Sequence, residues 1–413
     1  MHPKRKLKLV LMLGMLCAIG PFSIDMYLPA FPAIASALHT TVARISLSLS
    51  SFFIGISFGQ MFYGPLLDRF GRKKPLYVGF SVYFVASVGC ALASNADQLI
   101  WLRLFQAVGS CSGLVAARAM VRDLFPVEEN AKIFSLLMLV VGVSPIIAPT
   151  LGGYLTAAFG WHSIFVFLTI MSALVLTGVH YLLPETRKPD HLLQLKPSSV
   201  ISAYVSVAKE PYFYIYCLTG SVAAAGLYAY IAGSPSVFME LFHVSEKQYG
   251  WIFAAIAAGL ITSSQINSLL LKKYSSRQII VTALLFQSVA GVALFAGCWF
   301  NLLNVWGTIF LCFIFLSCQG FTFPNTTALS LAPFSKMAGS ASALLGSIQM
   351  AIGAITSSIV SYLSDGTARP MAGVMAACAI VSFMLVKNGE KFIGKQTAAN
   401  NAEEQVNEVI ATT

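Results

Sequence analysis

Long apolar runs separated by short polar stretches dominate this chain. A membrane-spanning helix needs about 20 apolar residues to cross roughly 30 Å of hydrocarbon, and twelve runs reach that length. A membrane β-barrel would show short segments of alternating hydrophobicity instead. The pattern predicts an all-α integral membrane protein whose spans are approximately 8–28, 46–66, 75–94, 99–121, 132–157, 161–183, 212–237, 249–271, 278–299, 304–324, 338–362 and 370–387.

The polar stretch 184–211 is the longest interruption inside the chain, and it divides the twelve spans into two sets of six. We therefore expect residues 1–183 and 212–387 to form two six-helix bundles joined by a cytoplasmic linker. Residues 388–413 are polar and are expected to form a disordered cytoplasmic tail. Parallel repeats of this kind place substrate between the halves, near the middle of the membrane.

Composition agrees with a membrane protein, because 57% of residues are apolar and only 10% are charged, against about 25% charged in ordinary soluble domains. A net charge of +10 would suggest nucleic acid in a soluble protein, but here basic cytoplasmic loops explain it. With the N-terminus inside, 21 of the 26 Lys and Arg lie on the cytoplasmic side, two lie in a span, and three lie outside. Both termini are therefore expected to be cytoplasmic.

Asp25 is the one carboxylate, among sixteen Asp and Glu residues, that lies well inside a predicted span. A charged aspartate at the centre of a membrane helix costs about 2.5–3.5 kcal/mol, so it needs a partner, a proton or water. Arg103 lies about one turn into the fourth span, at an estimated depth similar to that of Asp25. Two interpretations are open: a proton-coupling site in which Asp25 titrates and Arg103 responds, or a permanent ion pair that orients two helices.

Several polar or aromatic residues within the spans are candidates for a substrate cavity. Gln106 and Ser110 share a helical face with Arg103, where they would bond either substrate or neighbouring helices. Arg118 either snorkels to water or lines the inner mouth of a cavity. Apolar walls with a few polar groups suit moderately hydrophobic ligands. The candidate cavity residues are Gln106, Ser110, Arg118, Tyr228, Tyr230, Gln319, Asn325 and Gln349.

The loop Gly64-Pro-Leu-Leu-Asp68-Arg69-Phe-Gly71-Arg72-Lys73-Lys74-Pro75 joins the second and third spans. We expect Asp68 to accept hydrogen bonds from a helix N-terminus, where negative charge is favoured, and the loop to act in gating through Gly64, Asp68, Arg69, Gly71 and Arg72. A weak repeat of this loop follows the eighth span and lacks the aspartate and the glycines; its sequence is Leu271-Lys272-Lys273-Tyr-Ser-Ser-Arg277.

The fifth span carries Gly142-Val-Ser-Pro145-Ile-Ile-Ala-Pro149-Thr-Leu-Gly152-Gly153. Small residues on one face let another helix approach closely, and each proline removes a backbone hydrogen bond. The stripe is interpreted either as a rocking interface between the halves or as glycine-mediated packing without gating.

These features together resemble the drug:proton antiporters of the major facilitator superfamily. The segments Ser23-Ile-Asp25-Met-Tyr-Leu-Pro29-Ala-Phe-Pro32, Ala117-Arg118-Ala-Met-Val-Arg122-Asp123 and Ala338-Gly-Ser-Ala-Ser-Ala-Leu-Leu-Gly346 are similar to the bicyclomycin-resistance (Bcr/CflA) subfamily. The chain departs from the family pattern at Ala148, which occupies a usual glycine position in the fifth span.

The resemblance implies a bacterial inner-membrane exporter of chloramphenicol-, bicyclomycin- or sulfonamide-like drugs. It implies that proton entry supplies the energy, with no cofactor, and that Asp68 and the cations beside it stabilise one conformation. The expected partners are a small-molecule substrate, protons and the lipid bilayer, without nucleic acid, and the chain is expected to be a monomer. An importer or exporter of a small endogenous metabolite on the same fold is the alternative. An enzyme lacks support, because no cluster of His, Cys or carboxylates is expected at membrane depth.

Overall fold

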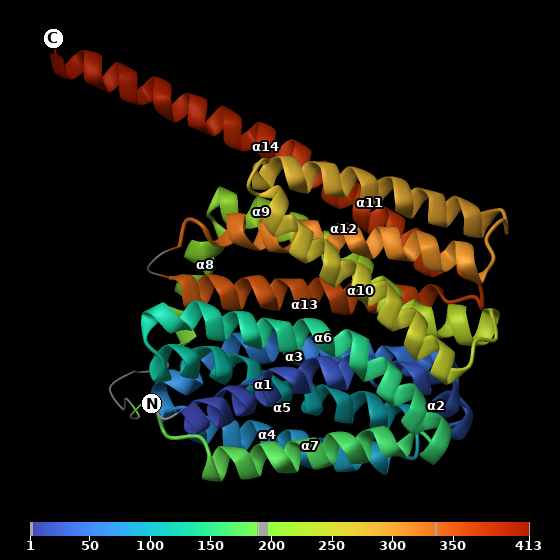
Figure 1. Ribbon diagram of the computed structural model, residues 1–413. Coiled ribbons are helices and arrows are strands. Elements are labelled where there is room, and N and C mark those ends of the chain that lie inside the picture. The colour runs from blue at the N-terminus through green and yellow to red at the C-terminus, as the bar shows by residue number, and fades with distance from the viewer. Residues whose placement is uncertain (1–2, 188, 190–196, 335–336, 413) are drawn as a thin grey trace.

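The computed structural model describes residues 3–187, 189, 197–334 and 337–412, and every regular element in these ranges is helical. Figure 1 shows the helices, most of them running along one common direction. In chain order they are α1 (Pro3–Asp25), η1 (Leu28–Ala30), α2 (Phe31–Ala37), α3 (Val42–Phe70), α4 (Lys73–Ala91), α5 (Ala96–Leu124), α6 (Val127–Phe159), α7 (His162–Tyr181), α8 (Pro197–Ala208), α9 (Pro211–Pro235), η2 (Ser236–Leu241), α10 (Glu246–Leu270), α11 (Ser276–Trp299), α12 (Val305–Leu331), α13 (Ala338–Leu363) and α14 (Arg369–Thr412).

Twelve helices in the described part of the chain are long and apolar enough to cross a membrane, and each coincides with one of the predicted spans. The first is longer than expected, because the apolar segment Lys6–Ala37 contains α1, η1 and α2 in succession. The prediction of an all-α, twelve-span architecture is confirmed, and the chain is a multi-pass membrane protein.

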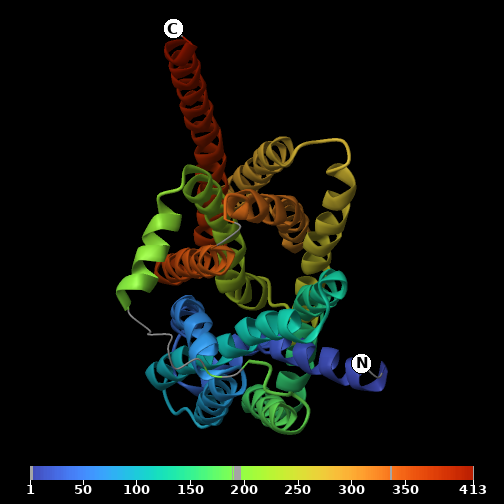
Figure 2. The ribbon, with the colours of Figure 1, turned by 90° about the vertical axis from the view of Figure 1, so that its left-hand side faces the viewer.

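The helices form two halves, with α1–α7 in the lower part of Figure 1 and α9–α14 in the upper part. Figure 2 shows the same division from one end, with α8 at the side between the halves. The halves meet where α3 packs against α13 and α6 packs against α10. Residues 188 and 190–196 of the expected linker lie outside the described residues.

The helix α14 continues past residue 387 to Thr412, which differs from the expected disordered tail. Both chain ends lie at the left-hand end of the molecule in Figure 1, as an even number of spans requires.

Small residues position helices within each half. In the first half, Gly55 and Gly59 of α3 face Ala107 and Cys111 of α5, where an added methyl group would overlap the neighbouring atoms. Hydrocarbon does not drive apolar helices together, so close van der Waals contact at small residues is a main source of association. This packing fixes the place of α5, which carries Arg103.

Candidate functional site

The carboxyl group of Asp25 lies at the boundary between the two halves. Asp25 is the last residue of α1, and it is 5% exposed. No ion pair or hydrogen bond to its carboxyl group occurs among the described residues. The hydroxyls of Tyr228, Tyr230 and Tyr249, all in the second half, lie within electrostatic range of it. The buried acid of the first half thus acts electrostatically on three tyrosines of the second.

Arg103 is fully buried inside the first half and does not pair with Asp25. Its guanidinium donates hydrogen bonds to the backbone oxygen of Ser23 at 2.7 Å and to Oε1 of Gln106 at 2.5 Å. It also lies over the rings of Tyr27 and Phe52, 4.8 Å and 4.2 Å from their centroids. The expected partnership is therefore wrong for this conformation, because equal depth along two helices does not make two side chains point toward each other.

Gln106 belongs to a buried polar network instead of an open cavity. Its Nε2 donates to Oγ of Ser87 at 2.7 Å, and the hydroxyls of Ser23 and Tyr83 lie 2.6 Å apart in the same region. Ser110 donates to the backbone oxygen of Ala107. These bonds satisfy polar groups within the first half, as burial requires.

Ser110 and Arg118 are the remaining cavity candidates of the first half, and both lie on α5. Ser110 borders a hollow of about 50 Å³ together with Pro21 and Gln60. The side chain of Arg118 is exposed although α5 continues for six more residues. Arg118 is therefore accessible toward the end of the molecule opposite Asp25, whereas Ser110 is buried.

Two of the second-half candidates form amide pairs inside that half. Nδ2 of Asn325 donates to Oδ1 of Asn267 at 2.7 Å, and Nε2 of Gln287 donates to Oε1 of Gln319 at 3.5 Å. All four side chains are buried. Gln319 and Asn325 therefore bond other amides of the second half in this conformation, and their place in a substrate cavity stays a prediction. Gln287 was missed, although an amide in the middle of an apolar span was a usable signal.

Tyr228 and Gln349 lie nearer the contact between the halves. The ring of Tyr228 lies 4.8 Å from that of Phe53 on α3, and its hydroxyl donates to the sulfur of Met350 at 3.7 Å. Gln349 is half-buried on α13. The hydroxyl of Tyr230 is buried and has no hydrogen-bond partner in the described part of the chain. Tyr230 therefore combines a place within electrostatic range of Asp25 with a hydroxyl that no described residue bonds.

The loop between α3 and α4 carries an ion-pair network. The Arg72 guanidinium pairs with Asp123 at 2.8 Å and with Asp68 at 3.0 Å, and Arg187 pairs with Asp68 at 2.8 Å. Burial acts to lower the pKa of Arg72, but its hydrogen bonds to Asp123 and Asp68 outweigh that effect and raise the pKa. The charges at this end of the first half therefore hold α3, α5 and the segment after α7 together.

Glu185 caps α4, which was the role expected of Asp68. Its carboxylate accepts hydrogen bonds from the backbone nitrogens of Arg72 at 2.6 Å and Lys73 at 3.0 Å. Gly71 has a φ of 81°, and a Cβ there would lie 3.0 Å from the Glu185 carboxylate. The prediction for Asp68 is wrong in this conformation, since a carboxylate from beyond α7 reaches the helix end first. Sequence reasoning missed Glu185, whose partner is 112 residues away.

The rest of the loop makes fewer contacts. Arg69 lies over the ring of Phe70 at 5.4 Å. A Cβ built on Gly64 would have no neighbour within 4 Å. Gly64 is therefore not required for close packing in this conformation.

The glycine stripe of α6 produces close helix contacts at one end only. A Cβ on Gly152 would overlap the backbone oxygen of Met26, and one on Gly153 would overlap the backbone oxygen of Glu246 in the second half. From the other side, a Cβ on Gly250 would lie 2.8 Å from the Cα of Thr150. Gly142 has no such neighbour. Pro145 and Pro149 lie within α6, which remains one helix.

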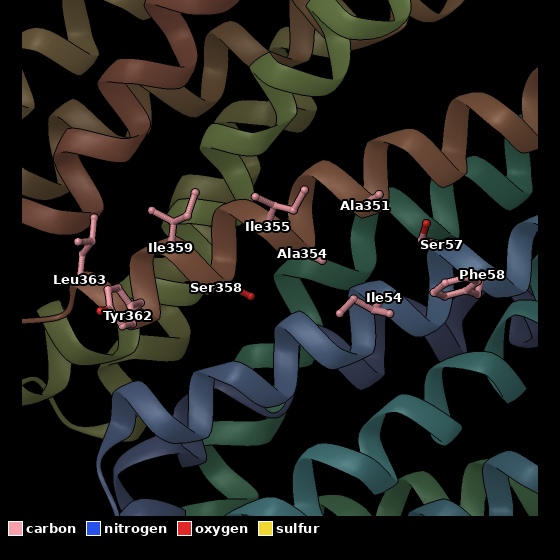
Figure 3. A pocket seen from close by; sticks show the side chains of 10 residues that line it. All are labelled: Ile54, Ser57, Phe58, Ala351, Ala354, Ile355, Ser358, Ile359, Tyr362 and Leu363. Carbon is pink, nitrogen blue, oxygen red and sulfur yellow. The ribbon is translucent and has the colours of Figure 1, made fainter. Parts of the chain in front are cut away.

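The contact between α3 and α13 is a ladder of serine pairs. Ser46 bonds Ser361, Ser50 donates to Ser357 at 3.0 Å, and Ser57 donates to the backbone oxygen of Ser347 at 2.9 Å. An apolar groove of about 690 Å³ lies between these two helices. Figure 3 shows its lining residues, with Ser57 toward one end and Tyr362 toward the other. The bonded serines of α3 run from Ser46 to Ser57, so this contact follows the two helices for about three turns.

The sequence is similar to those of known membrane transporters. The family profile described as Major Facilitator Superfamily matches residues 11–358. The chain is 32% identical over 385 residues to the "Uncharacterized MFS-type transporter YdgK" of Bacillus subtilis (strain 168), covering 92% of this chain and 94% of that protein. It is 30% identical over 375 residues to the "Bicyclomycin resistance protein homolog" of Haemophilus influenzae, covering 91% and 94%. It is 28% identical over 373 residues to the "Multidrug resistance protein MdtL" of Escherichia coli O8 (strain IAI1), covering 90% and 93%.

Solved structures share the fold at low sequence identity. A bacterial homolog of the human lysosomal transporter Spinster, in an inward-facing and occupied conformation, has a TM-score of 0.74 at 14% identity, covering 92% of this chain and 96% of that one. A D-xylose-proton symporter has a TM-score of 0.71 at 12% identity, covering 92% and 97%. Together with the family match, these results show that the chain belongs to the Major Facilitator Superfamily and is a membrane transporter, not an enzyme.

Proposed function

We propose that this transporter exports small, moderately hydrophobic drugs, of the chloramphenicol, bicyclomycin or sulfonamide kind, in exchange for protons. The relatives named for bicyclomycin and multidrug resistance support the substrate class. The proposed setting is the bacterial inner membrane, with both termini cytoplasmic and the chain acting as a monomer. The excess of Lys and Arg in the loops on the side of the termini supports that orientation.

The observation that carries proton coupling is the buried, unpaired carboxyl group of Asp25. A charged carboxylate in a low-dielectric interior is costly unless it is paired and hydrogen-bonded. With no cation beside it among the described residues, Asp25 is stable here as the neutral acid. Opening of the halves at this end would bring water to the carboxyl group and lower the cost of its charge. Its protonation state would then depend on which end of the transporter is open.

Arg103 has a supporting role in this proposal. It holds the last turn of α1 through the carbonyl of Ser23, two residues before Asp25. Movement of α1 relative to α5 would change that bond and the position of the carboxyl group together. Arg103 therefore responds to the state of Asp25 through the backbone, without a direct ion pair.

The proposed substrate site lies on the boundary between the halves, between Asp25 and the opposite end. Tyr228, Tyr230 and Gln349 supply polar groups from the second half, and Ser110 and Arg118 supply them from the first. Gln106, Gln319 and Asn325 would act indirectly, by keeping their helices in place. The aromatic and apolar walls suit uncharged, moderately hydrophobic molecules.

Alternating access would occur by separation of α6 and α10 at the glycine contacts. Gly152 and Gly153 allow close packing at the end near Asp25, while Arg118 is exposed toward the other end. This conformation is therefore closed at the end that holds Asp25, and Pro145 and Pro149 provide places for α6 to bend. The Asp68–Arg72–Asp123 network would stabilise this conformation, because it holds the opposite end of the first half together.

Transport by purified protein in vesicles tests this function. An imposed pH gradient should drive chloramphenicol against its concentration gradient, in the direction opposite to the protons. Accumulation that is insensitive to the pH gradient would refute proton exchange. Movement of drug in the same direction as the protons would instead support an importer.

A further inference from the structure

A second apolar groove lies in the second half, away from the proposed transport site. It has a volume of about 580 Å³ and is bordered by α10, α11 and α12. Its walls include Thr282 and Phe286 of α11 and Phe313 and Phe321 of α12. Phe286 is 61% exposed and Phe313 is 40% exposed, and both belong to spans. The groove therefore opens onto the surface that faces lipid.

The dimensions of this groove match one lipid tail in one leaflet. Along α11 it extends from Gln278 to Phe286, which is roughly 12 Å at the helical rise of about 1.5 Å per residue. Half of a typical hydrocarbon core is about 15 Å. The groove thus runs from the end of α11 to about the middle of the membrane.

Cations surround the open end of the groove. Lys272 and Lys273 lie in the loop between α10 and α11, Arg277 lies in the first turn of α11, and all three are exposed. Tyr274 of the same loop lines the groove itself. Among the described residues neither lysine forms an ion pair. Arg277 donates to the hydroxyl of Tyr212 at 3.1 Å and lies within electrostatic range of Glu390. The two lysines are thus the cations available to an external anion.

In the equivalent loop of the first half, by contrast, the cations have partners within the protein. There Arg72 pairs with Asp68 and Asp123, and Lys73 donates to the backbone oxygen of His180 at 3.2 Å. The sequence after the eighth span keeps the cations of that loop but lacks the acid. Its lysines therefore present uncompensated positive charge beside an apolar groove.

We infer that this loop and groove bind one anionic phospholipid, with the phosphate at Lys272 and Lys273 and one acyl chain between α11 and α12. Juxtamembrane cations attract anionic headgroups, and basic pockets beside membrane helices are suited to them. A lipid supplies both the negative charge and the apolar chain, which a free phosphate ion would not. With both termini cytoplasmic, as proposed above, this lipid would lie in the cytoplasmic leaflet; the rest of the inference does not depend on that orientation.

The test uses the full chain in vesicles of phosphatidylcholine that contain a small fraction of a photoactivatable lipid. The reactive group is placed in the acyl chain of either phosphatidylglycerol or phosphatidylcholine, and cross-linked peptides are mapped by mass spectrometry. The phosphatidylglycerol probe should label the groove segments 278–286 and 313–321 severalfold more than the phosphatidylcholine probe. Equal labelling by the two probes, or labelling spread evenly over all spans, would overturn the inference.

Two double variants test whether the preference for phosphatidylglycerol depends on Lys272 and Lys273 or on positive surface charge in general. Lys272→Gln with Lys273→Gln should reduce labelling by phosphatidylglycerol to the phosphatidylcholine level. The control Lys74→Gln with Lys209→Gln removes two other exposed cations and should leave the preference intact. An unchanged preference in the first variant, or its loss in both, would contradict the site.

Two single variants on α11 test the groove itself, and competition with a drug tests for another occupant. Thr282→Phe should lower labelling severalfold, whereas Ser288→Phe, elsewhere on α11, should not. Displacement of the probe by chloramphenicol would show that the groove takes drug, and would overturn the assignment to lipid. The experiment needs no proton gradient, so its failure is distinguishable from a failure of drug–proton exchange.

Discussion

The guanidinium of Arg103 donates a 2.7 Å hydrogen bond to the backbone oxygen of Ser23. This bond connects α5 to the last turn of α1, immediately before Asp25. The arginine therefore controls where the acid lies without neutralising it. Replacement of Arg103 should therefore have a different consequence from replacement of Asp25, and the two variants can be compared directly.

Replacement of Asp25 by Asn should abolish drug accumulation driven by a pH gradient while leaving drug binding measurable. Asn is similar in shape but cannot carry the proton. The measurement is accumulation and equilibrium binding in proteoliposomes. Asp97→Asn is the control, because Asp97 is an exposed acid paired with Arg44. Proton-driven export that persists in Asp25→Asn would eliminate this residue as the coupling group.

Replacement of Arg103 by Ala should destabilise the protein and stop active export. It removes the Arg103 donors from the Ser23 carbonyl and from Oε1 of Gln106, and each such loss at a buried acceptor costs about 1–3 kcal/mol. Arg103→Lys keeps the charge but loses the planar fork, so we expect an intermediate melting temperature.

The role of Arg103 in coupling is measured separately, as drug affinity against pH in wild type, Arg103→Ala and Arg103→Lys. A shifted curve in the variants would indicate that Arg103 acts on Asp25. Three superimposable curves would mean that Arg103 is structural only.

Substitution of Gly153 by Ala should disfavour the conformation that is closed at the Asp25 end. The added methyl group would overlap the backbone oxygen of Glu246, and neither backbone can retreat without moving a helix. We expect slower export and greater reactivity of a cysteine placed at this end toward a membrane-impermeant maleimide.

Gly142→Ala is the matched control for Gly153→Ala, since it adds the same methyl group to α6 where no neighbour lies within 4 Å. It should transport normally and leave maleimide reactivity unchanged. Equal behaviour of the two variants would contradict a gating role for the glycine contact.

Replacement of Glu185 by Gln should lower stability by about 0.5–2 kcal/mol, because the helix cap loses its charge and one of the two oxygens that accept from the backbone nitrogens of Arg72 and Lys73. The measurement is thermal unfolding of the purified protein. Glu210→Gln is the comparison, since Glu210 precedes α9 but makes no side-chain cap. A larger loss in Glu210→Gln would argue against the cap assigned to Glu185.

Asp68→Asn should impair transport more than stability. It weakens the ion pairs with Arg72 and Arg187, which we propose stabilise one conformation, while Glu185 keeps α4 capped. Transport rates and membrane levels of the variant are the measurements. A normal transport rate would remove Asp68 from the gating mechanism.

The apolar pattern of the sequence determined the number, order and approximate limits of the spans. This is because hydrocarbon forces each crossing segment to be a long apolar helix that satisfies its own backbone. The same pattern singled out Asp25 and the charged loop after α3, since charges in or beside lipid are too costly to occur without a reason. Local sequence was sufficient for these features because the bilayer, and not a distant residue, sets the constraint.

Only the tertiary structure decided which side chains meet. Arg103 and Asp25 lie at similar depth, yet their directions depend on how α1 rotates against α5, a rotation that packing at small residues sets. Glu185 accepts hydrogen bonds at the start of α4 although it lies in a distant segment of the chain. Gln319 accepts a hydrogen bond from Gln287 on another helix. Span pattern and depth constrain position along the membrane normal, whereas rotation about each helix axis is set by contacts between residues far apart in the chain.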